Sequence, residues 1–245
     1  MTNKTLIELL KSVSFIGFDV RRSPKPIESI VMPPERRLAS LLQPNCPTVL
    51  SADRSIWPSV FYNQESYQYV ENKFTDDIII SETLSDDYFQ AFDLWEELSA
   101  MLQAYKESST GDCGVAFGLV KPNYYANELI SDDWFDAIYS ESGVVPPKTA
   151  IDWPLLGFDV VNSGFQSAIS GFVLKDKNAL EKKWAKNMND YCLFNSRDQA
   201  LLFNEHANVD YKADGPFYTL AIFLLWDTNG ELKTRANKNI LLDSE

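Results

Sequence analysis

Cys113 and His206 are the residues of this chain whose types could together perform nucleophilic catalysis. Cys113 lies between Asp112 and Gly114, and His206, the single histidine, lies near the end of a predicted helix. A thiol catalyst needs a nucleophile, a base and a group that orients the base. The two residues predict a cysteine hydrolase. The alternative is a buried structural cysteine and an unrelated surface histidine, since cysteine is among the most buried residue types.

The tripeptide Asp112-Cys113-Gly114 resembles the nucleophile segment of papain-like cysteine peptidases. In that family the cysteine opens a helix, whose N-terminal dipole stabilises the thiolate. The resemblance extends over three residues and implies that Cys113 would be the nucleophile. The apolar sequence from 111 to 120 fits either a tight entry into a helix or a buried strand.

Asp19 and Asp159 form a second candidate pair, which would predict a carboxylate hydrolase. Each follows an apolar run of β-type residues, and side chains at strand ends often face a cleft. Glycosidases place two carboxyl groups roughly 5–10 Å apart across a sugar. The alternative is that each aspartate caps the next turn by accepting hydrogen bonds from backbone amides.

The two aspartates belong to an internal echo in the sequence. Gly17-Phe18-Asp19-Val20 is repeated as Gly157-Phe158-Asp159-Val160, and a serine follows each copy at the same distance. Two strands with the same entry and exit would indicate two related lobes. The alternative is a chance match between two strands of similar composition, because true repeats extend over a longer frame.

Metal and phosphate chemistry have little support in the sequence. The acidic pairs 76–77, 86–87 and 132–133 offer hard oxygen donors, but no calcium-binding loop pattern surrounds them. No phosphate-binding glycine loop is present. The sequence therefore predicts no metal site and no cofactor.

Charge is the most unevenly distributed property of the chain. Residues 71–141 contain sixteen acidic and three basic residues, which accounts for the whole net charge of −13. Aromatic residues are interleaved with these acids, and aromatic side chains often anchor protein interfaces. The segment therefore predicts a surface for a basic protein partner, and a solvated helix face is the alternative.

Some acids of this segment lie where helix N-termini favour negative charge, so a smaller group carries the partner hypothesis. The predicted partner-binding residues lie before the helix predicted at 86–106 and on the outer face of that helix: Asp76, Asp77, Glu82, Asp93, Glu96 and Glu97.

These features favour a non-catalytic protein that binds and masks a basic partner. In size, acidity and lack of catalytic motifs the chain is similar to the toxin-neutralising immunity proteins of bacteria. The few, scattered basic residues argue against nucleic-acid binding. Three widely spaced cysteines and the lack of a signal peptide or a membrane-length apolar run predict a cytoplasmic protein that does not enter membranes. The sequence leaves the oligomeric state open.

Hydrophobic patterning predicts an α+β fold with mixed helices and mostly antiparallel strands, because helices and strands do not alternate regularly. Strands are predicted at 15–20, 155–161 and 217–226, and helices at 5–12, 35–42, 86–106, 132–139, 176–191 and 196–206.

Domain organisation is predicted from a proline- and glycine-containing connection at 142–154. It would separate an N-terminal lobe, 1–141, which carries the acidic segment, from a C-terminal lobe, 155–245. The C-terminal lobe would end in a hairpin around Asn229-Gly230, a dipeptide typical of tight turns between strands. A single domain is the alternative.

Overall fold

The computed structural model describes part of the chain, and the structural statements below concern that part. The described residues are 13–22, 50–53, 56–57, 112–120, 153–162, 165–169, 184–210, 215–227 and 232.

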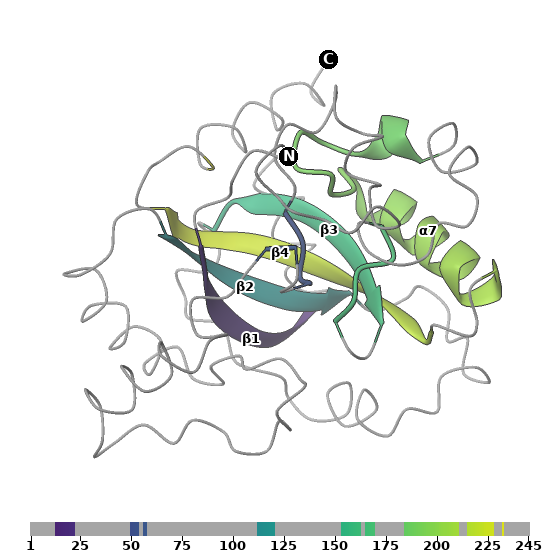
Figure 1. Cartoon of the computed structure of the whole chain (residues 1–245), viewed down its shortest axis with the longest axis horizontal. Coiled ribbons are helices and arrows are strands. Elements are labelled where there is room, and N and C mark those ends of the chain that lie inside the picture. Colours follow the sequence, from purple (N-terminus) through teal and green to yellow (C-terminus); the bar gives the residue numbers. More distant parts are fainter. Residues whose placement is uncertain are drawn as a thin grey trace.

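A four-stranded antiparallel sheet forms the centre of the described structure (Figure 1). Its strands are β1 (Val13–Arg22), β2 (Asp112–Val120), β3 (Leu155–Asn162) and β4 (Phe217–Asp227), in the order β1-β2-β4-β3. The three predicted strands are confirmed, and 112–120 is a strand rather than the start of a helix. Together with one α-helix, the sheet gives the described residues a mixed, antiparallel α+β character.

The sheet is shared between the two halves of the chain. β1 and β2 come from residues before the predicted connection at 142–154, and β3 and β4 come from residues after it. β2 pairs with β4 in the middle of the sheet, so strands of both predicted lobes form one continuous hydrogen-bonded layer.

β1 and β3 contain the same irregularity within the same four-residue sequence. The pairing of β1 with β2 shifts between Phe15 and Gly17, and that of β3 with β4 shifts between Leu155 and Gly157. Both glycines have positive φ angles, 157° and 147°, which residues with a Cβ adopt only with strain. The sequence echo is therefore accompanied by the same β-bulge in both strands.

The two bulged strands occupy equivalent positions at the two edges of the sheet. Gly17 lies opposite Phe117, Gly157 lies opposite Ile222, and Phe117 and Ile222 lie opposite each other. A half-turn about an axis through this central pair exchanges β1 with β3 and β2 with β4. The register of the sheet thus has local twofold symmetry.

One face of the sheet, here named the carboxylate face, carries Asp19 and Asp159. Directly paired residues share a face, and side chains alternate along a strand. The central row of paired residues, which consists of Gly17, Phe117, Ile222 and Gly157, therefore lies on this face too. Residues 50–53 and 56–57 cover it, since three of them belong to one apolar cluster with the strands. That cluster includes Leu50, Ala52, Trp57, Val115, Phe117, Leu119, Leu220, Ile222 and Leu224.

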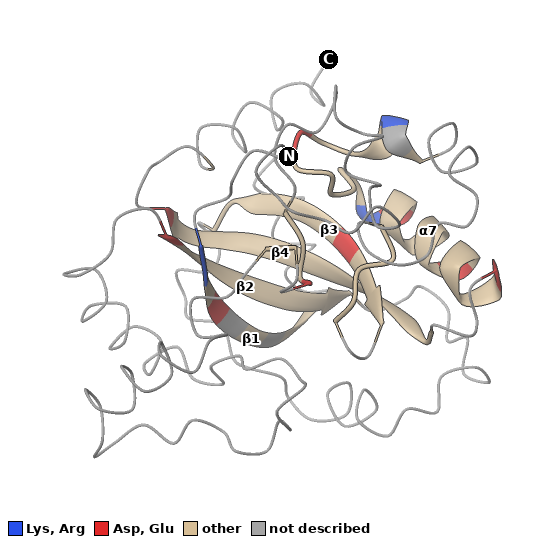
Figure 2. Cartoon of the chain, viewed as in Figure 1, with Lys and Arg blue, Asp and Glu red and all other residues tan. Residues whose placement is uncertain are grey.

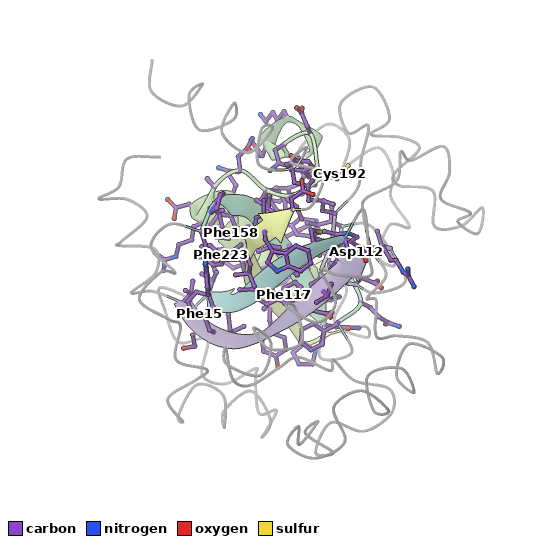
Figure 3. The ribbon with its side chains drawn as sticks, turned by 90° about the vertical axis from the view of Figure 1, so that its left-hand side faces the viewer. Phe15, Asp112, Phe117, Phe158, Cys192 and Phe223 are labelled. Carbon is purple, nitrogen blue, oxygen red and sulfur yellow. The ribbon has the colours of Figure 1, made fainter. Side chains whose placement is uncertain are left out.

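Phenylalanine side chains pack on the opposite face. The ring centroids of Phe15 and Phe223 are 5.4 Å apart, and Phe15 also meets Trp153 edge-on at 6.0 Å. Figure 3 shows Phe15 and Phe223 at the same part of the sheet. The bulge places Phe15 here, because without the extra residue Phe15 and Gly17 would point to the same face.

Helix α7 (Arg197–Asp210) packs against β3 and β4, and it confirms the helix predicted from 196. The Ser196 hydroxyl accepts a hydrogen bond from the Gln199 amide at 3.2 Å, which satisfies one of the free amides of the first turn. Near the other end, Asn208 bonds both backbone groups of Phe217, at 2.8 and 3.0 Å. This pair of bonds ties the last turns of α7 to the first residue of β4.

The helix predicted at 176–191 is wrong for its described part, residues 184–191, which form a short 3₁₀ turn at Ala185–Asn187 followed by turns. The Asn189 side chain explains the difference. Its amide donates to the Leu156 carbonyl at 2.7 Å, and its oxygen accepts from the amides of Tyr191 and Leu193. Such local bonds compete with the helical pattern.

Several predicted elements lie outside the described residues. They are the helices at 5–12, 35–42, 86–106 and 132–139 and most of the return strand of the C-terminal hairpin. Leu232, the described residue of that predicted strand, is helical, so the strand prediction is wrong at this position. Among the helices of the described ranges, none combines the length and the apolar character needed to span a lipid bilayer.

Replacing Gly157 by alanine is expected to lower the free energy of unfolding by about 3 kcal/mol or more. A Cβ there would lie 2.6 Å from the Leu193 Cβ, at a φ of +147°. Gly215→Ala is the control, because its Cβ would meet its nearest atom at 3.3 Å, and we expect a loss below about 1 kcal/mol. Urea unfolding measures both, and equal losses would refute the role given to the bulge.

Candidate functional site

Asp19 is buried on β1 and is paired with a cation two residues along the same strand. Its carboxylate accepts the Val20 amide at 2.8 Å and contacts the Arg21 Nε at 2.9 Å, with both side chains fully buried. Residues two apart on a strand point to the same face. The β-strand itself therefore brings the two charges together.

The Arg21 guanidinium also holds the segment that covers the carboxylate face. It donates to the carbonyl of Trp57 at 2.5 Å and to the carbonyl of Ala52 at 3.0 Å. Its central carbon lies 5.8 Å from the Trp57 ring centroid and 5.2 Å from that of Phe117, within the range of a cation–π contact. Arg21 thus lies between the sheet and the segments that contain Ala52 and Trp57.

Asp159, at the matching position on β3, is surrounded by four hydrogen-bond donors. One oxygen accepts the Ser51 hydroxyl at 2.5 Å and the Ala52 amide at 3.0 Å. The other accepts the Ser167 hydroxyl at 2.7 Å and the Val160 amide at 2.8 Å. The carboxyl group therefore joins three parts of the chain, residues 50–53, β3 and residues 165–169.

A second aspartate strengthens this junction. The Asp53 carboxylate accepts the Ser167 amide at 3.2 Å, and the Asp53 amide donates to the Ser51 hydroxyl at 3.0 Å. The result is a buried polar cluster of two carboxylates and two hydroxyls. Figure 2 shows the acidic positions on the two edge strands, β1 and β3.

Burial raises the pKa of Asp159 from 3.8 to about 6. The hydrogen bonds from Ser51, Ser167, Ala52 and Val160 act in the opposite direction, because they stabilise the ionised form. Loss of solvation is therefore the larger effect. Among the described residues, Asp159 forms no salt bridge, in contrast to Asp19.

The sheet does not bring Asp19 and Asp159 together. They lie on opposite edge strands with β2 and β4 between them, which separates them by about 14 Å across the sheet. They are also offset along it, because Asp19 is level with Val115 whereas Asp159 is level with Leu119 through Leu220. This arrangement does not match the roughly 5–10 Å that a carboxylate hydrolase requires.

Cys113 is a buried residue of β2, and its thiol lies 3.7 Å from the Arg21 carbonyl. Burial raises the pKa of the Cys113 thiol well above its usual range, and the carboxylate of Asp227 raises it further. A reactive cysteine needs a lowered pKa. The surroundings of Cys113 thus favour the protonated, unreactive thiol.

His206 lies on α7, where its Nδ1 contacts the Asp210 carboxylate at 2.7 Å and its ring packs 5.8 Å from that of Trp184. It is near the start of β4, to which α7 is joined at Phe217. Cys113 pairs with Asp227 at the other end of this 11-residue strand, about 30 Å away along β4. The structure does not bring the thiol and the imidazole within hydrogen-bond reach.

The predicted partner-binding acids, Asp76, Asp77, Glu82, Asp93, Glu96 and Glu97, lie outside the described residues. Within the described part of the chain, no group of three or more histidine, cysteine, aspartate or glutamate side chains is arranged to hold a metal ion.

The partners of the two aspartates were not predicted from the sequence. Arg21 could have been found, because it lies two residues after Asp19 and thus on the same face of a predicted strand. Ser51 and Asp53 gave no signal that would connect them with Asp159, since they are more than a hundred residues away in the chain.

Comparison with known proteins gives no match. No protein-family model, no curated protein and no solved structure matches this chain. The function is therefore inferred from charge and geometry alone.

Replacing Ser51 by alanine is expected to raise the pKa of Asp159 further, because a donor to the ionised carboxylate is lost. The loss of unfolding free energy should be about 1–3 kcal/mol at pH 7. It should be smaller at pH 4.5, where Asp159 is protonated. Urea unfolding at the two pH values measures the difference.

Ser196→Ala is the matched control for this experiment. It removes a hydroxyl that caps α7, at a cost of about 1 kcal/mol, and the loss should be the same at both pH values. A pH-independent loss for Ser51→Ala as well would show that the hydroxyl does not act through the ionisation of Asp159.

Cys113 is expected to react with iodoacetamide at least about a hundredfold more slowly in the native protein than in urea, because it is buried on the inner strand β2 and exposed only by opening. Mass spectrometry of the peptide that contains Cys113 follows the reaction separately from other cysteines. Alkylation at a comparable rate in both states would contradict the structural role.

Proposed function

We propose that this chain is a non-catalytic acidic interaction protein that binds and masks a basic protein partner in the cytoplasm. The observation that carries the proposal is the concentration of the whole net charge of −13 in residues 71–141. Fields of opposite sign steer association and raise its rate. A segment of one sign in an otherwise near-neutral chain is suited to that role.

The arrangement of the reactive residue types supports a non-catalytic role. Asp159 uses its carboxylate to accept four hydrogen bonds inside the protein, and Asp19 is paired with Arg21. Cys113 is buried, and His206 contacts Asp210. Each of these side chains thus has a structural role, and the two candidate catalytic pairs are held apart.

The partner that fits is a compact basic protein rather than a nucleic acid, whose phosphates would be repelled by the acidic segment. Neutralisation of a toxin, as performed by the immunity proteins of bacteria, is one function of this kind, because an immunity protein blocks a basic toxin by covering it. The acids Asp76, Asp77, Glu82, Asp93, Glu96 and Glu97 would provide the steering charge. Neighbouring aromatic residues would provide anchors that slow dissociation.

The architecture that we propose for the whole chain is two related lobes, 1–141 and 155–245, which share one sheet. The shared sequence, bulge and edge position of β1 and β3 support this interpretation. In this interpretation, the acidic segment is an insertion in the N-terminal lobe. In the sequence it lies partly between β1 and β2 and partly after β2. The C-terminal lobe has no counterpart of similar charge.

Reversal of two acids should weaken partner binding. The partner is first captured from a lysate of the native cell, eluted with salt and purified. We expect Asp76→Lys with Asp77→Lys to lower its association rate at low salt about tenfold, because the steering field is reduced. Stopped-flow mixing with the purified partner measures this rate.

The control reverses Asp190 and Asp198, which are exposed in the described C-terminal part, and changes the net charge equally. We expect its association rate to stay within about twofold of the original. An equal reduction in both variants would show a general effect of net charge, and no reduction in either would refute the acidic surface.

A further inference from the structure

The Asp159 carboxyl joins two chain segments to the edge of the sheet by hydrogen bonds. Residues 50–53 and 165–169 come from distant parts of the sequence, and each donates a serine hydroxyl to this group. The first segment also donates the Ala52 amide. We name this arrangement the Asp159 clasp, meaning Asp159, Ser51, Ala52 and Ser167.

Among the described residues, few charges face the clasp. On the covering segment, Asp53 lies beside it and accepts the Ser167 amide. From β1, Arg21 donates to the Ala52 carbonyl, in the peptide group that follows the one donating to Asp159, and is itself paired with Asp19. The described residues 165–169 carry no charged side chain. In the sheet, Asp159 lies opposite Leu220 of β4, which in turn lies opposite Leu119 of β2, so its neighbours across the strands are apolar.

Both protonation states of Asp159 fit the same arrangement of atoms. Two of its four donors are hydroxyl groups, which can rotate and accept a hydrogen bond instead of donating one. A protonated carboxyl can therefore donate to Ser51 or Ser167 while it still accepts from the amides of Ala52 and Val160. The neutral form also avoids the cost of burying a charge that none of the described cations contacts.

We propose that the Asp159 clasp is a proton-linked device that holds residues 50–53 on the carboxylate face more firmly in mildly acidic than in neutral medium. Opening of the clasp would lift Leu50 and Ala52 from the apolar cluster of the sheet. Proton uptake by one buried group thus controls access to that cluster.

The direction follows from the pKa of Asp159, which is raised from 3.8 to about 6 in the closed protein. The closed form therefore binds the proton more tightly than an open, solvated form. Its extra stability is complete below about pH 4 and is lost as the pH rises through about 6.

Hydrogen exchange of the Ala52 amide, which donates to Asp159, tests the proposal on the full chain. After correction for the intrinsic rate, we expect its protection factor to be about tenfold lower at pH 7 than at pH 5, from the linkage between opening and one proton. The Ile222 amide, in the central row of the sheet, serves as the internal reference, and its protection factor should not show the tenfold difference between pH 5 and pH 7.

Two variants assign the effect to a residue. Asp159→Asn cannot ionise and should abolish the tenfold difference, whereas Asp53→Asn keeps an acceptor for the Ser167 amide and should retain it. Loss of the difference in Asp53→Asn with retention in Asp159→Asn would overturn the proposal. So would its absence in the unmodified protein.

A titration of the Asp159 side-chain carboxyl carbon by NMR keeps the proposal testable if a variant fails to fold. A midpoint near pH 6, with the Ala52 amide shift following the same curve, supports the clasp. A midpoint near pH 4 or below would overturn it.

Discussion

Two carboxylates are buried on one face of a four-stranded sheet, and neither can be left without donors. An ionised group in an apolar interior is costly unless it is paired or hydrogen-bonded. Asp19 obtains a cation from its own strand, and Asp159 obtains hydroxyls and amides from two other segments. The requirement of these groups for partners decides where residues 50–53 and 165–169 lie.

The local twofold symmetry of the sheet makes the two solutions directly comparable. Each aspartate follows a bulge at a positive-φ glycine, and each accepts the amide of the next valine at 2.8 Å. Beyond that shared bond they differ, because residue 21 is arginine where the equivalent residue 161 is valine. The Asp19 carboxylate has a cation in contact with it, whereas the hydroxyls around Asp159 can also accept a hydrogen bond from its protonated form. Equivalent positions thus carry a salt bridge on β1 and the Asp159 clasp on β3.

Much of the sheet could be predicted from the sequence. Apolar, β-branched runs indicated the strands that became β1, β3 and β4, and Ser196 marked the start of α7. Residues 184–191 could not be predicted in this way. Hydrogen bonds of the Asn189 side chain, including one to the Leu156 carbonyl of a distant strand, override the helical pattern of these residues. Such a bond has no signature in the local sequence.

The sequence by itself determined which charges exist and how they are spread, because net charge depends only on composition. It also revealed the echo that places an aspartate after each glycine. Only the tertiary structure decided what those aspartates do, because hydrogen bonds and desolvation depend on neighbours in space. Asp19 and Asp159 were candidates for one catalytic pair, but the order β1-β2-β4-β3 places them at opposite edges. One chain segment more than a hundred residues from Asp159 supplies two of its four donors.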